Sequence, residues 1–217
     1  MKSDIQINQN VLKELKWDPE IREEHVGVTV HDGVVTLTGH VPTYRQKSAS
    51  MDAAKRVADV KAIIDNIDVR LEREMRTTDE GLAERIANVL TWNVSVAGKE
   101  VKAEVKNGVV TLTGGVDWQY QRINIERNIE HVRGVANIVN LITVKQHVST
   151  IDVQQKIKEA LQRHAEVEAS KITVAASDGT VTLTGKVESL VEMDRIEAAA
   201  WAAPGISEVV NNLSVYD

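Results

Sequence analysis

The sequence predicts an α+β protein of three tandem αββαβ modules, each with two helices packed on one face of a three-stranded mixed sheet. A seven-residue stretch, Gly33–Gly39 (GVVTLTG), returns at Gly108–Gly114 and, with one change, at Gly179–Gly185, at offsets of 75 and 71 residues. Around each copy the same helical and strand periodicities recur in the same order. We therefore place three domains at residues 4–70, 79–145 and 150–217.

The first helix of each module begins after a pair of polar residues of the kind that cap helices. These pairs are Ser3-Asp4, Thr78-Asp79 and Ser149-Thr150. Apolar residues then recur at helical spacing: Ile7, Val11 and Leu15; Leu82, Ile86 and Leu90; Val153, Ile157 and Leu161. This spacing predicts a helix with one buried stripe.

Two strands follow, joined by a tight turn. The first strand alternates apolar and other residues, with Val26, Val28 and Val30, then Val101, Ala103 and Val105, then Ile172, Val174 and Ala176 on one face. The turn is Asp32-Gly33, Asn107-Gly108 or Asp178-Gly179, which indicates a two-residue hairpin because both turn positions need positive φ. We expect the second strand to end at Gly39, Gly114 or Gly185.

A second helix is predicted over Tyr44 to Ala58, Gln119 to Val132 and Leu190 to Ala202. Its expected inward positions are Ala53/Val57, Asn128/Val132 and Ala199/Ala203. Gly134 and Gly205 stand where helices commonly stop. The first module has Asp59 there, so its helix end is expected to be built differently or to be more strained.

The third strand is predicted over residues 63–69, 138–144 and 209–215. Strand parity points Asp65, Asn140 and Asn211 inward in the three modules. One interpretation is structural: the short polar side chain bonds nearby backbone and fixes where the strand begins. The alternative is a cation site made with loop carbonyls, for which Asp65 is the best candidate.

The module leaves one sheet face uncovered, since two helices cover only one side of three strands. That face is expected to be polar, paired with a neighbour or used for binding. The linkers, residues 71–78 and 146–149, are too short and too poor in Gly and Ser for freely moving units. We expect a compact or gently curved array with contacts through sheet edges or the uncovered faces.

Composition limits the function classes. The 217 residues are 42% apolar and 27% charged, as in a soluble globular protein, with no Cys and no Phe. The net charge of −6 and the absence of a basic module argue against nucleic acid as a partner. No apolar run approaches a membrane span, and Met1 to Gln6 has no signal core. We expect a cytoplasmic protein as the sequence stands, or a periplasmic one if a signal sequence has been removed.

Catalytic motifs do not emerge from the sequence. The six histidines form no His-Glu-x-x-His pair and no metal-ligand spacing, although His31 and His40 flank one strand and are candidates to approach each other. The carboxylate pairs Glu23-Glu24 and Asp65/Asp68 are not repeated in the other modules. We therefore expect no catalytic residue, no metal and no cofactor, and a protein that is not an enzyme.

The aromatic residues are the candidate binding residues. Trp17 and Trp92 stand at equivalent positions after the first helix, where the third module has Arg163. Trp118 and Tyr120 open the second helix of the middle module, and Tyr44 lies near that place in the first, followed by Arg45 and Lys47. They are either core or interdomain fillers in a chain without Phe, or side chains that insert into a lipid interface or a partner groove.

These features together resemble the BON domain, named from bacterial osmotically inducible and nodulation proteins. The resemblance rests on the Asp/Asn-Gly turn, the Val-Thr-Leu-Thr-Gly strand, the Gly-Val or Gly-Ile after the second helix and the Asn before the last strand, and it covers nearly the whole chain. The resemblance implies a structural role for the glycines at both ends of the repeated stretch: Gly33, Gly39, Gly108, Gly114, Gly179 and Gly185. Asp59 departs from the family's glycine.

The resemblance implies a non-catalytic module of bacterial stress response and envelope integrity that attaches to phospholipid surfaces or to proteins. Some relatives are linked to chaperone-like activity, and one group pairs the domain with potassium sensing. We expect a binding protein for a phospholipid surface or a protein partner. The alternative is a sensor of a small cation, potassium or calcium, or of another ligand.

Overall fold

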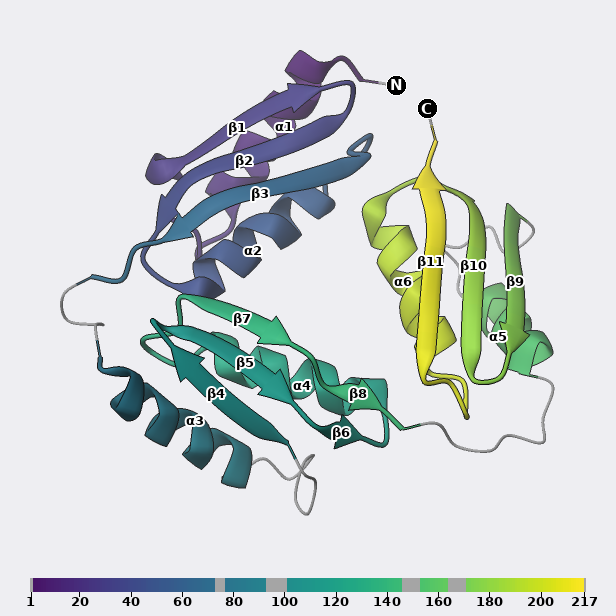
Figure 1. Ribbon diagram of the computed structural model, residues 1–217. Helices are drawn as coiled ribbons and strands as arrows, with labels where there is room; N and C mark the ends of the chain where they lie inside the picture. Colours follow the sequence, from purple (N-terminus) through teal and green to yellow (C-terminus); the bar gives the residue numbers. More distant parts are fainter. Residues whose placement is uncertain (1, 73–76, 93–100, 146–152, 164–170, 217) are drawn as a thin grey trace.

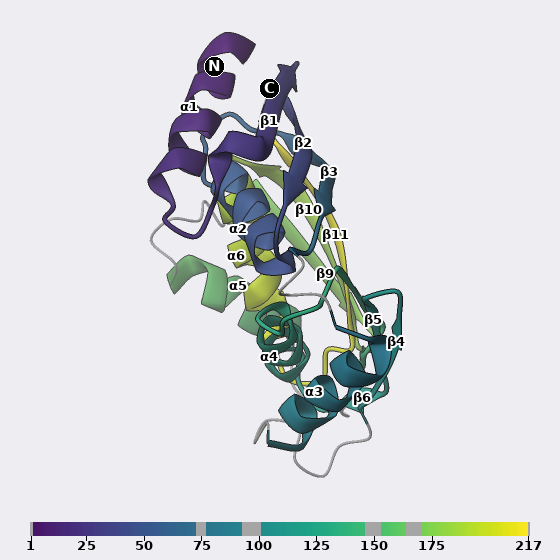
Figure 2. The same cartoon turned by 90° about the vertical axis from the view of Figure 1, so that its left-hand side faces the viewer.

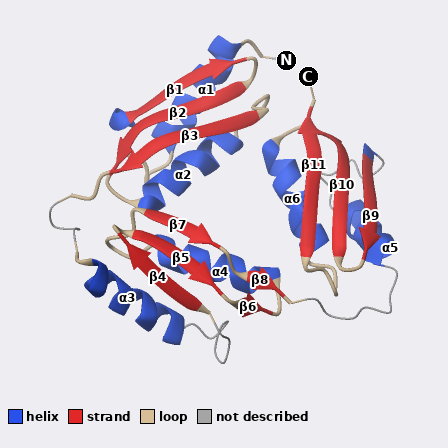
Figure 3. Cartoon of the chain, in the orientation of Figure 1, coloured by secondary structure: helices blue, strands red, loops and turns tan. Residues whose placement is uncertain are grey.

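A computed structural model of the chain describes residues 2–72, 77–92, 101–145, 153–163 and 171–216. The predicted fold class is confirmed, because each module runs helix, strand, strand, helix, strand and has a sheet of its own (Figures 1 and 3). The second strand is central in each three-stranded sheet, and in the middle module the continuations of the second and third strands form a separate two-stranded sheet. It pairs antiparallel with the first strand and parallel with the third.

The elements of the first module are α1 (Asp4–Trp17), the short 3₁₀ helix η1 (Glu23–His25), β1 (Val26–His31), β2 (Val34–Val41), α2 (Tyr44–Lys55) and β3 (Ala62–Val69). Those of the second are α3 (Asp79–Trp92), β4 (Lys102–Lys106), β5 (Val109–Thr113), β6 (Gly115–Val116), α4 (Gln119–Glu130), β7 (Asn137–Asn140) and β8 (Thr143–Val144). Those of the third are α5 (Val153–Arg163), β9 (Ile172–Ser177), β10 (Thr180–Val187), α6 (Leu190–Trp201) and β11 (Glu208–Val215).

The helix starts follow the predicted caps where the structure describes them. Ser3 accepts a hydrogen bond from the backbone N–H of Gln6 and the Gln6 side chain accepts from that of Ser3, which completes a capping box. Thr78 accepts in the same way from the N–H of Gly81. The predicted cap of the third module, Ser149-Thr150, lies outside the described residues.

The hairpin turn is tied to the helix that precedes it. Asp32 and Gly33 have φ of 50° and 79°, as the two-residue turn requires. The Asp4 carboxylate accepts hydrogen bonds from both of their backbone N–H groups, at 2.9 and 3.0 Å. Asp79 binds the N–H groups of Asn107 and Gly108 in the same way, at 2.7 and 3.0 Å. The first helix and the hairpin tip are therefore joined by a carboxylate latch that the sequence analysis missed.

The second strand was predicted to end at the repeated glycine. It stops there only in the middle module. β2 runs two residues past Gly39 to Val41, and β10 runs past Gly185 to Val187. Gly39 has φ of 111°, and a Cβ on it would overlap the backbone carbonyl oxygen of His25. The glycine thus lets the strand bend against the start of β1 without stopping. In the middle module the strand breaks at Gly114 into β5 and β6.

The predicted inward face was wrong at Asn128 of α4 and one residue off at Ala199 of α6, whereas Ala203 is buried as predicted. Ala53 and Val57 are buried in the first module as predicted, but Asn128 is exposed and the buried stripe of α4 is Gln121, Ile125 and Ile129. In its last turns α2 buries two neighbours, Ala53 and Ala54, whereas α4 buries only Ile129, so Asn128 lies just outside the stripe. In α6 the buried positions are likewise Glu192, Ile196 and Ala200.

The strained helix end predicted at Asp59 is present. Asp59 has φ of 69°, in the left-handed region that Gly134 and Gly205 occupy with φ of 102° and 90°. A non-glycine residue there costs about 1 kcal/mol.

The modules meet through their second helices. The prediction of contacts through sheet edges or uncovered faces was wrong. α2, α4 and α6 lie at the centre of the molecule (Figure 1). Tyr44 and Trp201 pack against the core of the middle module, and Leu190 packs against that of the first. Lys55 on α2 pairs with Asp194 on α6 at 2.9 Å.

The uncovered sheet faces point to one side of the molecule. All three sheets lie in front of their helices in Figure 1, and Figure 2 shows strands along one side and helices along the other. Each uncovered face carries an exposed aliphatic residue, Ile64, Val139 or Val210, opposite a threonine of the central strand. In the described part of the chain, no helix has the length and apolar character needed to cross a membrane.

The approach of Gly39 to His25 gives a stability prediction. Gly39→Ala should destabilise the first module by about 3 kcal/mol, because it adds left-handed strain and a backbone overlap. Urea unfolding followed by far-UV circular dichroism measures the loss. Gly115→Ala is the control, since its φ is not in the left-handed region and a Cβ there would first meet the flexible end of Lys145 at 3.4 Å; equal losses in both variants would refute the argument.

Candidate functional site

The two tryptophans that end the first helices project into solvent. Trp17 is the last residue of α1 and Trp92 the last of α3, and they are 84% and 82% exposed. The filler interpretation is therefore wrong for both. The tryptophan that does fill a junction is Trp201 of α6, which the sequence analysis did not single out.

The aromatic residues at the start of α4 are partly exposed. Trp118 is 39% exposed and Tyr120 is 57% exposed. Trp118 occupies the cap position that Thr43 and Ser189 hold in the other modules, where the hydroxyl accepts a hydrogen bond from Gln46 or Glu192. An indole has no such acceptor, so the middle module carries an aromatic surface where the others have a helix cap.

Tyr44 lies at the junction of the first two modules. It packs against the core of the middle module from the first turn of α2. Burial, followed by the nearby carboxylates Glu126, Glu130 and Asp65, raises the pKa of Tyr44 to about 12.

The other two predicted binding residues of α2 also make contacts within the chain. Arg45 pairs with Glu20 at 2.6 Å and with Glu130 at 3.5 Å. Lys47 pairs with Asp65 at 2.8 Å. The structure thus brings Tyr44 and Arg45 to the junction, and keeps Trp17 and Trp92 apart from it at the ends of their own helices.

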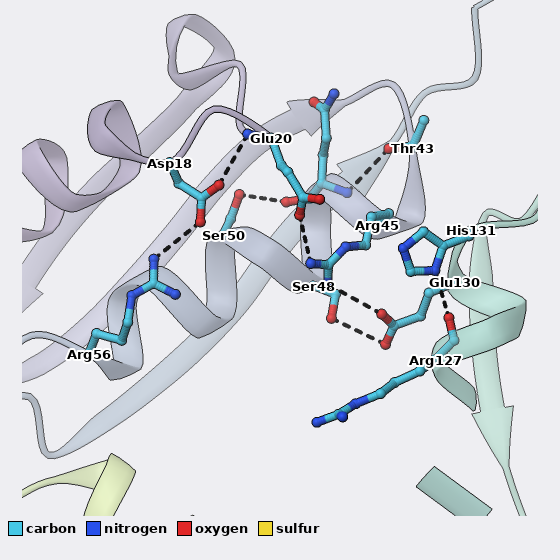
Figure 4. Close-up of polar contacts among 11 residues, drawn as sticks. Asp18, Glu20, Thr43, Arg45, Ser48, Ser50, Arg56, Arg127, Glu130 and His131 are labelled. Atoms are coloured by element: carbon cyan, nitrogen blue, oxygen red, sulfur yellow. Dashed lines mark hydrogen bonds and ion pairs between the residues drawn. The ribbon is translucent and has the colours of Figure 1, made fainter. Parts of the chain in front are cut away.

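A polar groove of about 470 Å³ separates α2 from α4, lined by Arg45, Ser48, Asp52, Ile123, Glu126, Arg127, Glu130 and His131. Figure 4 shows Arg45 and Ser48 pointing at Glu130 from the opposite helix, and the Ser48 hydroxyl donates to Glu130 at 3.3 Å. Burial raises the pKa of Glu130, while Ser48 and Arg45 oppose that rise. Arg45, Ser48 and Glu130 therefore join the two modules across the groove.

The recurring polar residue of the third strand makes the backbone bond that was expected, but within the strand and not at its start. Asp65, Asn140 and Asn211 accept from the backbone N–H two residues on, at 3.0, 3.1 and 3.1 Å. Asp65 and Asn211 lie inside β3 and β11, and Asn140 ends β7. Both Asp65 oxygens are engaged, one by Ile67 N–H and the other by Lys47.

The recurring polar residue of the third strand also contacts a side chain of the second helix. That helical partner differs between modules, according to whether the strand residue is Asp or Asn. Asn140 donates to Glu126 at 2.8 Å and Asn211 donates to Glu197 at 2.9 Å. In the first module Met51 replaces that glutamate, and Asp65 pairs instead with Lys47, one turn earlier. The sequence already shows this correlation, because the module with Asp in the strand has Lys in the helix and the modules with Asn have Glu.

His31 and His40, which flank one strand and were candidates to approach each other, do not meet. His31 ends β1 and His40 lies near the far end of β2, so the strand separates them. His40 meets His25 instead, with ring centroids 4.7 Å apart. His147 and His164 lie outside the described residues.

The family model described as "BON domain" matches residues 3–70, 78–146 and 150–217. A curated relative, "Osmotically-inducible protein Y" of Escherichia coli strain K12, is 30% identical over 151 residues, which cover 65% of this chain and 73% of the relative.

Two solved structures of CdsD, a structural protein of the type III secretion system of Chlamydia trachomatis, also align with the chain. One is 15% identical with a TM-score of 0.27, covering 97% of this chain and 92% of that one. The other, its C-terminal domain, is 17% identical with a TM-score of 0.26, covering both chains fully. Scores this low do not indicate a common arrangement of the whole chains.

The exchange of polar pairs between modules predicts a rescue. Asp65→Asn should cost the first module about 1 kcal/mol, because Lys47 loses its charged partner in a partly buried setting. The triple variant Lys47→Met, Met51→Glu, Asp65→Asn installs the set of the third module and should recover most of that loss in urea unfolding. A triple variant less stable than the single one would show that the pairs are not equivalent.

The position of Tyr44 predicts a loss of stability at alkaline pH. Below pH 10 the phenol is neutral in the folded and unfolded states and has no effect. Between pH 10 and about 12 the unfolded state loses the proton while the folded state keeps it, so stability falls as the pH rises. Tyr44→Phe should remove this component, seen as a smaller drop in urea midpoint from pH 9 to pH 11; identical drops in both proteins would contradict the assignment.

Proposed function

The chain belongs to the BON domain family, with three copies over residues 3–70, 78–146 and 150–217, and from that premise we propose that it is a non-catalytic protein that attaches to phospholipid surfaces. The name of its relative, "Osmotically-inducible protein Y", leads us to place this attachment in the response to osmotic stress. In this proposal the first helices of the first two modules carry the side chains that contact the lipid interface.

The exposure of Trp17 and Trp92 supports this proposal most directly. Both are the last residue of the first helix of their module, and both leave most of the indole in water. Indole rings favour the boundary between lipid headgroups and acyl chains, because one edge is polar and the rest apolar. A side chain used for packing would be covered, as Trp201 is in part.

The charges near the two tryptophans indicate insertion more than general attraction. The last turn of α1 carries Lys16 beside Trp17, whereas α3 has no basic residue in its last turn. The chain as a whole carries −6, which opposes attraction to anionic lipid. We therefore expect binding that depends on the indoles and only weakly on salt.

The alternative function, a cation sensor centred on Asp65, has no comparable support. Both oxygens of that carboxylate already accept hydrogen bonds, from Ile67 N–H and from the Lys47 ammonium group. An ion there would have to displace Lys47.

Co-sedimentation with phosphatidylcholine and phosphatidylcholine–phosphatidylglycerol vesicles, at low and high salt, tests the proposal. Trp17→Ala with Trp92→Ala should weaken binding about tenfold, a loss of about 1.4 kcal/mol. Trp17→Phe with Trp92→Phe should keep most of it, since a large apolar ring remains. Intrinsic fluorescence of the parent should shift to the blue on binding.

Arg163→Ala is the matched control at the equivalent position of the third module, and it should bind like the parent. Failure of the parent to bind either vesicle at either salt concentration would remove the lipid proposal and favour a protein groove as the partner of the two tryptophans. Full binding by the double alanine variant would place the lipid contact elsewhere.

A further inference from the structure

The hairpin tip of the first module gathers three metal-ligating side chains that the sequence analysis did not connect. Asp4 begins α1, His31 ends β1 and Asp32 stands in the turn between β1 and β2. One donor atom from each lies within 4.8 Å of the other two, and no other such trio occurs among the residues that the structure describes. His31 Nε2 is 3.5 Å from Asp32 Oδ2.

The three donors differ in how firmly they are held. The two oxygens of Asp4 accept hydrogen bonds from the N–H groups of Asp32 and Gly33, which fixes the carboxylate while leaving it further lone pairs. The side chains of His31 and Asp32 are exposed, so they are free to close on an ion that Asp4 has bound.

A hollow of about 210 Å³ opens beside the trio. It is lined by Asp4, Asp32 and a third carboxylate, Asp59, and also by Lys2, Ser3, Ile7, Gly33 and Lys61. The backbone N–H of Lys2 donates to Asp59 at 3.4 Å. An ion at the trio therefore has space beside it for the water molecules that complete its coordination.

The middle module shows which of these residues the fold requires. Its turn is Lys106-Asn107-Gly108, and Asp79 makes the same two hydrogen bonds to it. The latch thus needs only the aspartate of the first helix. The imidazole of His31 is the addition of the first module that the fold does not explain, since the equivalent residues are Lys106 and Ser177. The carboxylate of Asp32 recurs in the third module as Asp178, so the first module alone places an imidazole beside it.

We propose that Asp4, His31 and Asp32 bind a divalent transition-metal ion of the zinc type. Imidazole nitrogen and carboxylate oxygen are ordinary zinc ligands, and a site with three protein ligands leaves a position for water. Calcium and magnesium prefer sites made of oxygen alone, so the imidazole selects against them. The ion joins the start of α1 to the hairpin tip, so it stabilises the folded first module by linkage.

Isothermal titration of the untagged full chain with zinc chloride tests the site, beside a thermal melt with and without zinc. The variant His31→Lys, Asp32→Asn copies the turn of the middle module and keeps Asp4, so it is expected to fold. The parent should bind one equivalent at this site and melt at a higher temperature with zinc. The variant should lose at least about tenfold in affinity, the equivalent of 1.4 kcal/mol, and most of the shift in melting temperature.

His40→Gln is the control, because it removes the other histidine contact of the module, His25 with His40. It should bind zinc like the parent. The proposal is overturned if the parent does not bind, if the turn variant binds as tightly as the parent, or if His40→Gln is the variant that loses the ion.

Discussion

One polar side chain in the third strand holds the second helix of every module, and the assembly of the chain depends on that helix. Asp65, Asn140 or Asn211 binds the backbone of its own strand with one atom and a helical side chain with another. Because these contacts are partly buried, an unmatched partner would leave a polar group without a hydrogen bond. The helices so positioned, α2, α4 and α6, are the ones through which the modules meet.

The division of roles among the aromatic residues follows from the same arrangement. A core without Phe packs on aliphatic side chains, and Tyr44 and Trp201 are used between modules. Trp17 and Trp92 end helices that lie away from the centre and keep their rings in water. The middle module also gives up a helix cap to place Trp118 at the start of α4.

The sequence was sufficient where short-range rules decide the structure. The Asp32-Gly33 turn, the Ser3 cap and the strained end at Asp59 were predictable, because backbone sterics at each place leave few choices. The inward face of α4 was misjudged because α4 buries one residue in its last turns, Ile129, where α2 buries two neighbours, Ala53 and Ala54. The junctions were misjudged because Tyr44, Leu190 and Trp201 act over distances in the chain that periodicity does not reveal. The metal trio joins residues 4, 31 and 32, and only the fold brings them together.

Tyr44, Leu190 and Trp201 pack across module borders. The unit that repeats in the sequence is therefore smaller than the unit that folds. Each repeat has an apolar interior of its own, yet two of these interiors are closed by a side chain from another repeat. A repeat cut out at its sequence borders would expose those interiors at once, and a unit of this size has little stability to spare. The three repeats are therefore similar in sequence, yet the first and the middle one each depend on another repeat to cover part of their interior.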